Sequence, residues 1–461
     1  MKSTKKLQIW GVVAILILLT LWLKWDNWFY NPIEPTYQTN GNPSRILITC
    51  SGDFLTSRDI TWQSDPESLK GSIQYLDLSK PSDTTIMYVD GLTIKTSGGA
   101  AAYFKIKLKN LTPGSTYKYR VSNKSNHSEW AEFKIAPLTD HSYSFIYLGD
   151  VQDSINGQSS TLFQKAFDSQ KEAAFIMFVG DMIERPHDAY WGEWFRAGGD
   201  RFRTTPVIAT PGNHEYYKGI VQKLDERWTS HFSFPTNGPE NFLGRAYYWD
   251  YQNTRFISID TNGIQSISSA LEQRSWLKKV LETNHQKWTI VFMHHPLYST
   301  SRGRDYFYLR TLFKSLFEKH NVDLVLAGHD HAYGRASSIP NSENNGKQGP
   351  IYIVAHASPK VYDIDFSNKM DKLASNTATY QLLNVTKDSI RLSAFTAKGE
   401  YFDGFKLQKD STGVKKVTIY TTKSDPKYLN PTKSYLQKNS KKEIEKYNAE
   451  MQQWISKKSL N

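Results

Sequence analysis

The chain has 461 residues, enough for two folded domains with extensions, and 14% of them are aromatic, which excludes a disordered or fibrous protein. Its single cysteine, Cys50, excludes an intramolecular disulfide, so any metal site must use other side chains. More than half of the net charge of +12 lies in residues 409–461, where twelve lysines accompany five acidic residues. This basic tail either approaches anionic surfaces or serves solubility, and no specific nucleic-acid binding is predicted because no basic motif interleaved with aromatics occurs elsewhere.

Residues 1–31 have the pattern of a membrane signal. Three lysines precede an apolar run from Leu7 to Leu23, which as a helix spans roughly 25 Å, the short limit for a bilayer. No small-residue cleavage site follows the run. We predict an uncleaved signal anchor: a transmembrane helix with a cytoplasmic N-terminus and the rest of the chain at the cell surface. A cleaved signal peptide, which would give a secreted protein, is the alternative.

Residues 42–137 alternate short strands with turns, and no helical period intervenes. The expected strands are RILITC, DITWQS, TTIMYVDG, AYFKIKLKNL, STYKYRVSN and EWAEFKIAP. This pattern predicts a small antiparallel β-sandwich. The run LKNLTPGSTYKYRVS, which ends in a Tyr-x-Tyr strand, resembles fibronectin type III domains. Such a module more often positions a neighbour or binds a surface than performs chemistry.

Residues 141–408 alternate apolar strands with amphipathic helices. The strands include YSFIYLGD, AAFIMFVGD, TPVIATPGNHE, RFISIDTN, WTIVFMHHP, VDLVLAGHDH and GPIYIVAHASP. Continuous apolar strands are typical of sheets whose faces are covered, so this region predicts an α/β domain. In the basic extension 409–461, a capping box begins at Ser440, and five apolar residues at helical spacing then predict an amphipathic helix docked on the body.

Five of the apolar strands end in clusters of metal-ligand residue types. These are Gly149-Asp150, Gly180-Asp181, Gly212-Asn213-His214-Glu215, His294-His295-Pro296 and Gly328-His329-Asp330-His331. Each cluster alone is compatible with a turn or a helix cap. Because loops at the carboxyl ends of strands in an open α/β sheet converge, we expect the clusters to meet in one crevice.

The ordered set GD, GD, GNHE, HHP and GHxH resembles the calcineurin-like metallophosphoesterases. The sandwich and the HAY of GHDHAYGR look most like the purple acid phosphatase branch. The resemblance implies two mixed sheets flanked by helices in a four-layer αββα domain behind the fibronectin III-like domain. It also implies the metal ligands, one metal being bound by Asp150, Asp181 and His331, and a second by Asp181, Asn213, His294 and His329. Asp181 would bridge the two metals, and His214 would protonate the leaving oxygen or stabilise the phosphoryl group.

The chain departs from this family pattern at three places. Glu184 stands where the purple enzymes have an iron-binding tyrosine, so we expect no purple colour. Gln152 stands where many relatives have a histidine. Gln152, Glu184 or water would complete the ligands of the first metal, and the metals would be Fe, Mn or Zn. Arg302 and Arg304 lie near the usual position of a histidine pair, where they would grip a phosphate oxygen or remain solvated. His295 would support a ligand or turn the chain.

Together these features predict a membrane-anchored, extracytoplasmic metallophosphoesterase with two metal ions. Its substrate would be a phosphorylated small molecule or polymer, and hydrolysis of monoesters is favoured because the purple acid phosphatase branch hydrolyses monoesters. A phosphodiesterase using the same centre is one alternative. A surface-binding or adhesion protein with a degenerate phosphoesterase domain is the other, suggested by the fibronectin-like module and the basic tail.

Overall fold

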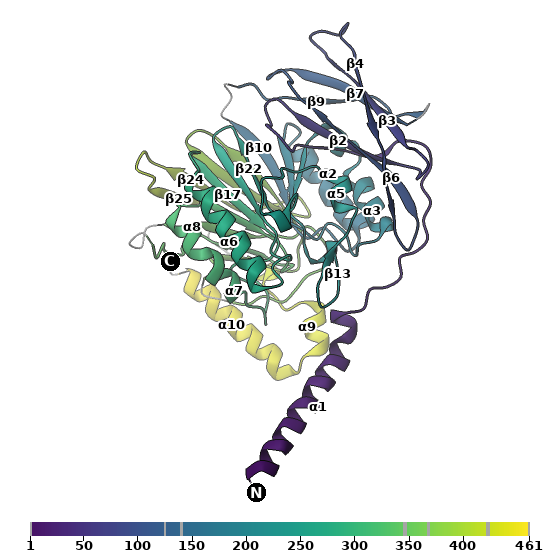
Figure 1. The fold of residues 1–461 in the computed structure, drawn as a ribbon. Helices are drawn as coiled ribbons and strands as arrows, with labels where there is room; N and C mark the ends of the chain where they lie inside the picture. The colour runs from purple at the N-terminus through teal and green to yellow at the C-terminus, as the bar shows by residue number, and fades with distance from the viewer. Residues whose placement is uncertain are drawn as a thin grey trace.

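The computed structural model of the chain describes residues 2–123, 126–138, 142–343, 348–366, 369–420 and 425–459. These residues form an N-terminal helix, a β-sandwich, a larger domain with two sheets, and C-terminal helices that pack on the larger domain (Figure 1).

Helix α1 (Lys2–Trp28) extends away from the body of the molecule (Figure 1). Several of its apolar side chains are exposed, among them Trp10, Leu18 and Trp22. Within the described residues, however, no helix combines the length and the apolar character needed to cross a membrane. The transmembrane helix predicted in residues 1–31 is therefore not confirmed.

The sandwich consists of two antiparallel sheets between Ser44 and Lys134. One sheet has the order β1 (Ser44–Thr49), β2 (Arg58–Ser64), β6 (Ala100–Leu108), β5 (Leu92–Lys95). The other has the order β4 (Thr85–Asp90), β3 (Lys70–Asp77), β7 (Thr116–Asn123), β8 (Asn126–His127), and β9 (Ala131–Lys134) also pairs with β7. Alternate side chains of both sheets form one apolar core, in which Trp62 stacks on Phe104 with ring centroids 5.1 Å apart.

The larger domain contains two seven-stranded mixed sheets. The first has the order β12 (Val207–Ala209), β11 (Phe175–Phe178), β10 (Tyr143–Leu148), β22 (Thr379–Val385), β23 (Ser389–Thr396), β24 (Tyr401–Lys409), β25 (Lys415–Ile419). The second has the order β15 (Tyr247–Tyr251), β16 (Thr254–Ile259), β17 (Trp288–Met293), β18 (Leu324–Ala327), β20 (Ile351–Val354), β19 (Tyr333–Ala336), β21 (Lys372–Ala374). The strands β10, β11 and β12 are parallel, as are β16, β17, β18 and β20.

The two sheets face each other across an aromatic core. Phe145 and Phe175 of the first sheet stack at 4.8 Å, and Phe256 of the second packs edge-on against Phe145 at 5.6 Å. Neighbouring residues along a strand point to opposite faces, so Phe292 joins this core whereas Val291 contacts the helices outside.

Helices cover the outer face of each sheet, which gives the four layers that the resemblance implied. Helices α2 (Ser160–Ser169) and α3 (Asp188–Gly198) pack on the first sheet, and α6 (Ile267–Glu282) and α8 (Ser315–Lys319) pack on the second. The shorter elements are α4 (Arg201–Thr204), α5 (Trp228–His231), α7 (Phe307–Leu309) and the hairpin β13 (Tyr216–Tyr217), β14 (Lys223–Leu224).

The C-terminal region begins later than the sequence indicated. Strand β25 continues the first sheet beyond residue 408, because Lys415 lies buried against Asp323 and the lysine-rich strand is therefore part of the domain. After α9 (Lys433–Lys438), helix α10 (Lys441–Ser459) docks on the second sheet's outer layer through Met451 and Trp454, as predicted. The capping box is also present, since Ser440 N donates to Glu443 Oε2 at 2.8 Å.

Candidate metal centre

The five predicted clusters meet at one edge of the larger domain, as expected from the strand order. The loops after β10, β11 and β12 come from the first sheet, and those after β17 and β18 come from the second. Parallel pairing within each sheet brings the carboxyl ends together. Four of the predicted ligands have left-handed backbones, which is uncommon outside glycine: Asp150 (φ 46°), Asp181 (φ 52°), His329 (φ 73°) and His331 (φ 45°). Such backbone strain concentrates at functional sites.

One ligand set consists of Asp150, Asp181 and His331. Each offers one atom, and the three atoms lie within 4.8 Å of one another, all on buried residues. His331 Nδ1 lies 3.1 Å from the carbonyl oxygen of Lys360, to which it donates, and this leaves Nε2 facing Asp150 Oδ1 at 3.6 Å. A histidine whose other nitrogen is engaged in this way is typical of a metal ligand.

The second set consists of Asp181, His294 and His329, and it shares Asp181 with the first. His294 Nε2 lies 3.2 Å from Asp181 Oδ2 and 3.0 Å from His329 Nδ1. Asn213, the fourth predicted ligand, places Oδ1 3.1 Å from His294 Nε2. His294 Nδ1 donates to the carbonyl oxygen of Val179 at 2.9 Å, so its Nε2 is also directed at the cluster.

The electrostatics of the cluster call for cations. Burial raises the pKa of Asp150 well above its usual value, because its charge lies in a site away from water. Burial opposes the charge on His294 as well, but the neighbouring Asp181 carboxylate raises the pKa of that imidazole to about 9. Two buried carboxylates beside several imidazoles are stable together when cations offset the carboxylate charge, and the same donors are suitable ligands for Fe, Mn or Zn.

Unpartnered oxygens at this cluster also fit a metal site. Among the described residues, Asp150 Oδ1, Gln152 Oε1 and Glu184 Oε2 are buried and have no hydrogen-bond partner. Gln152 Nε2 lies 3.1 Å from Asp181 Oδ2 and 3.0 Å from His331 Nε2. A half-turn of the Gln152 amide would place its oxygen there instead, so the residue fits the role of an additional ligand.

Two other members of the motifs do not act as ligands. His295 donates to or accepts from Thr261 Oγ1 at 2.9 Å, and its ring packs on His329 with centroids 4.1 Å apart. Burial and the nearby His294 lower the pKa of His295 to about 3, so it stays neutral and supports the ligand beside it. Asp330 Oδ2 instead accepts from Ser299 Oγ and Thr300 N, each at 2.7 Å, and holds the neighbouring loop.

The two arginines predicted to bind substrate have different positions. Arg302 donates to Glu450 of α10 at 2.5 Å and lies over the Tyr447 ring, so the structure engages its guanidinium with α10 and does not bring it to the ligands. The sequence could not reveal this, because the partner lies far along the chain. Arg304 remains next to the site, where it donates to the carbonyl oxygen of His329 at 3.0 Å.

His214 lies beside the shared aspartate. Its backbone N–H donates to Asp181 Oδ1 at 2.9 Å, and its Nδ1 donates to the carbonyl oxygen of Glu184 at 2.6 Å. Its Nε2 is consequently the nitrogen directed toward the cluster, 3.8 Å from Asp181 Oδ2. The side chain is 21% exposed, so Nε2 is accessible to a bound substrate.

Glu215 belongs to one of the predicted clusters, but the sequence assigned it no role, and in the structure it organises the centre. Its carboxylate is buried and accepts from Asp181 N (2.9 Å), Gly212 N (2.7 Å), Met182 N (2.7 Å) and Ile183 N (3.3 Å). It therefore joins the loop after β11 to the loop after β12. The only signal available was an acidic residue two positions after the predicted ligand Asn213.

Lys360 was also missed, because it lies in a loop after β20 without any motif. Burial opposes its charge, but Tyr362, Glu184 and Asp181 together raise the pKa of its ammonium group. Lys360 thus brings a positive charge close to the ligands, which favours an anionic substrate.

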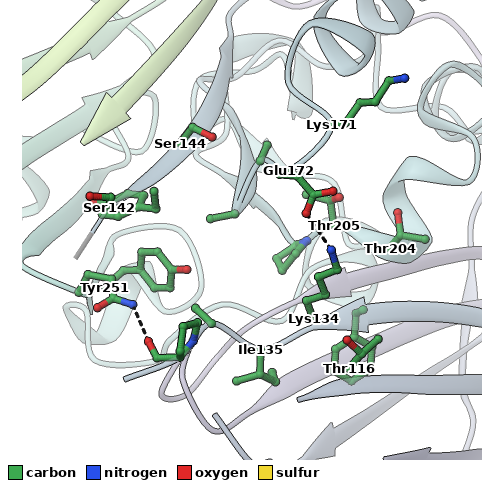
Figure 2. A pocket seen from close by; sticks show the side chains of 18 of the residues that line it. Thr116, Lys134, Ile135, Ser142, Ser144, Lys171, Glu172, Thr204, Thr205 and Tyr251 are labelled. Carbon is green, nitrogen blue, oxygen red and sulfur yellow. Dashed lines mark hydrogen bonds and ion pairs between the residues drawn. The ribbon is translucent and has the colours of Figure 1, made fainter. Parts of the chain in front are cut away.

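A cavity of about 710 Å³ lies elsewhere, at the junction of the sandwich with the larger domain. Figure 2 shows Lys134 and Ile135 of the sandwich facing Glu172 and Thr205 across it, and Lys134 pairs with Glu172 at 2.8 Å. None of the predicted site residues lines this cavity, so the metal centre and not this junction is the candidate active site.

Comparison with known proteins agrees with the fold. Residues 143–333 match the calcineurin-like phosphoesterase family, and residues 43–135 match the N-terminal domain of purple acid phosphatases. The chain therefore combines a calcineurin-like phosphoesterase domain with a purple acid phosphatase N-terminal domain, which confirms the resemblance drawn from the motifs.

Among individual relatives, purple acid phosphatase 15 of Arabidopsis thaliana is 25% identical over 370 residues, which cover 70% of this chain and 68% of that protein. Phosphoenolpyruvate phosphatase of Allium cepa is 27% identical over 269 residues, which cover 55% of each protein. The solved structure of PhoD has a similar fold, with a TM-score of 0.62 at 12% identity over 93% of this chain and all of that chain.

Proposed function

We propose that this protein hydrolyses phosphate monoesters at a dinuclear metal centre. The observation that carries the proposal is the pair of ligand sets that share Asp181, since a shared carboxylate can bridge two adjacent metals. Purple acid phosphatase relatives support the same reaction class. When bound, such a centre offsets the charge on the phosphoryl oxygens and lowers the pKa of a water molecule that attacks phosphorus.

The residues of the chain would divide the work as follows. Asp150, Asp181 and His331 hold one metal, and Asp181, Asn213, His294 and His329 hold the other. Gln152 or Glu184 supplies a further oxygen to the first. Asn213 contributes a neutral amide, which leaves more positive charge on its side of the centre to attract phosphate.

His214 is the proposed proton donor to the leaving oxygen. Because Nδ1–H donates to the carbonyl oxygen of Glu184, the proton that is transferred is the second proton of the imidazolium form, carried by Nε2 on the side of Asp181. A proton donor at this position lowers the barrier to release of the alcohol.

The test compares 4-nitrophenyl phosphate with bis(4-nitrophenyl) phosphate, with Mn or Zn added to the purified protein. We expect faster hydrolysis of the monoester, a loss of most turnover and of bound metal in Asp181→Asn, and a drop of about 10²–10⁴-fold in kcat in His214→Ala. Preference for the diester would establish the alternative phosphodiesterase. Absence of both metal and hydrolysis would favour a binding role, and an unaffected rate in either variant would refute the site assignment.

We also propose that the chain acts outside the cytoplasm, held at a membrane by its N-terminal segment. The lysines before the apolar run and the exposed apolar side chains of α1 support this location. Membrane fractionation of the full chain with a C-terminal tag, followed by protease treatment of intact spheroplasts, tests it. A tag recovered in the cytosol, or protected from the protease, would contradict the proposal.

A further inference from the structure

A pocket of about 370 Å³ opens directly beside Asn213 and His214. Three segments line it: the loop after β11 around Pro186, the start of the β13 hairpin, and the end of helix α1 with the residues that follow it, namely Asp26, Tyr30, Asn31 and Pro32. The chain thus returns from its N-terminal helix to form part of the wall of the candidate active site, a contact that no motif in the sequence indicates.

This N-terminal wall is fixed to the domain by specific bonds. Asn31 Oδ1 accepts from Lys218 N at 2.8 Å, and Asn31 Nδ2 donates to Lys218 O at 2.9 Å. The next residue, Pro32, offers its carbonyl oxygen to His187 Nε2 at 3.2 Å. The Asn31 side chain thus bonds both the N–H and the carbonyl group of Lys218, which fixes the position of this segment on the larger domain. The N-terminal wall is therefore part of the folded structure.

A buried ion pair secures the same segment a little further along. Glu34 is 6% exposed, and its carboxylate accepts from Arg227 Nη1 at 2.5 Å and from Asp188 N at 2.6 Å. Removing either charge would leave the other buried and unpaired, which is costly. The segment from Tyr30 to Pro32 is therefore held between α1 and a strongly anchored position.

The direction of the leaving group follows from His214. A general acid must lie within hydrogen-bond reach of the oxygen that it protonates. A phosphoryl group at the shared Asp181 therefore has its ester oxygen near His214 Nε2, and the alcohol must extend from there. His214 itself lines the pocket, and a volume of about 370 Å³ is suited to a small organic group.

The lining of the pocket indicates the chemical class of that alcohol. Rings and apolar surfaces form part of its lining, with Tyr30 and Pro32 from the N-terminal wall and Pro186 and Tyr217 from the larger domain, beside charged residues such as Arg185 and Lys218. Tyr217 is held in place because its hydroxyl donates to the carbonyl oxygen of Pro186 at 3.1 Å. Rings favour stacking on other rings, so the geometry points to an alcohol that carries a planar ring.

We infer that this pocket binds the leaving-group alcohol of the substrate, that it prefers an aromatic alcohol, and that Tyr30 determines this preference. The inference rests on the proposed phosphatase function. Tyr30 is 55% exposed and lies at the outer wall, so its replacement removes a contact with the alcohol without disturbing the core or the metal ligands.

The experiment compares two monoesters whose alcohols have similar acidity, 2-phenylethyl phosphate and ethyl phosphate. In Tyr30→Ala of the full chain, we expect KM for 2-phenylethyl phosphate to rise about threefold to tenfold, the loss of one aromatic contact, while KM for ethyl phosphate stays within about twofold. Asn31→Ala, which releases the bonds to Lys218, should shift KM in the same direction. Tyr88→Ala is the matched control, because Tyr88 is 78% exposed on β4 of the sandwich.

Binding gives a second readout that does not depend on turnover. Calorimetric titration with 3-phenylpropylphosphonate and with propylphosphonate, the non-hydrolysable counterparts of the two esters, should show the same selective loss of affinity in Tyr30→Ala. If Tyr30→Ala changes the values for both compounds equally, or for neither, the inference is refuted although the phosphatase function stands. If the wild-type protein hydrolyses neither 4-nitrophenyl phosphate nor these two esters, the proposed function fails, and the assignment of the pocket fails with it.

Discussion

Replacement of Glu215 by glutamine tests whether one buried carboxylate holds the metal centre together. The carboxylate accepts four backbone N–H bonds from the loops that carry Asp181 and Asn213. An amide retains one of the two oxygens, so at least two of the four bonds lose their acceptor. Hydrogen bonds to a charged group contribute about 1.5–3 kcal/mol each, which gives a loss of about 3–6 kcal/mol.

Part of this loss is offset, because burying the neutral amide costs less desolvation free energy than burying the carboxylate. Burial and the neighbouring Asp181 raise the pKa of Glu215 to about 7, which reflects that cost. We therefore expect Glu215→Gln to lower the free energy of unfolding by about 3 kcal/mol, near the smaller end of the range. The Asp181 loop should also shift, so the variant should bind less metal and turn over more slowly.

Urea unfolding, elemental analysis of bound metal and steady-state kinetics measure these three effects. Glu318→Gln is the matched control, since Glu318 is also a buried carboxylate but is bonded by Lys314 Nζ at 2.7 Å and Ser342 Oγ at 2.5 Å, outside the metal cluster. It should lose stability while retaining metal and activity. The reasoning is wrong if Glu215→Gln keeps both metals and unfolds within about 1 kcal/mol of the wild type.

Two further predictions concern stability. Burial, together with the charges of Arg45 and Arg227, lowers the pKa of His231 well below its usual value. Below about pH 6.5 the unfolded chain therefore binds a proton at this residue that the folded chain does not bind. As the pH is lowered below about 6.5, the free energy of unfolding should decrease by up to about 1.4 kcal/mol per pH unit. His231→Phe should flatten the urea-unfolding profile between pH 7.5 and 5, and an unchanged slope would contradict this account. Arg302→Ala removes the contacts with Glu450 and Tyr447, so it should cost about 1 kcal/mol in unfolding and leave KM unchanged; an increase in KM would restore Arg302 to the substrate site.

The position of the metal ligands could be predicted from the sequence because each follows an apolar strand. Strand order then brings Asp150 and Asp181 from one sheet together with His294 and His331 from the other. The topology of open α/β sheets requires loops at their carboxyl ends to meet, so local patterns were sufficient for this part of the site.

The contacts that the sequence could not reveal are those between distant segments. Glu215 accepts hydrogen bonds from backbone N–H groups. Every residue except proline has such a group, so the sequence does not indicate which of them Glu215 binds. Tyr30 reaches the active-site pocket only because Asn31 and Glu34 fix the linker on the larger domain. Strand β25 was missed for a similar reason: its lysines resemble a solvated tail until Asp323 is seen to pair with Lys415.

Two glycines of the motifs help to explain why short sequence patterns were sufficient to predict much of the site. A Cβ on Gly212 would lie 2.2 Å from Asp181 Oδ1, and a Cβ on Gly328 would lie 2.1 Å from Asp150 Oδ2. Both distances are far below van der Waals contact, so any larger residue would displace a metal-binding carboxylate. A glycine before a ligand permits a tight turn, but at these two positions the structure shows a second requirement. Each glycine makes room for the carboxylate of a different loop, so the motifs are coupled through space although each is local in the chain.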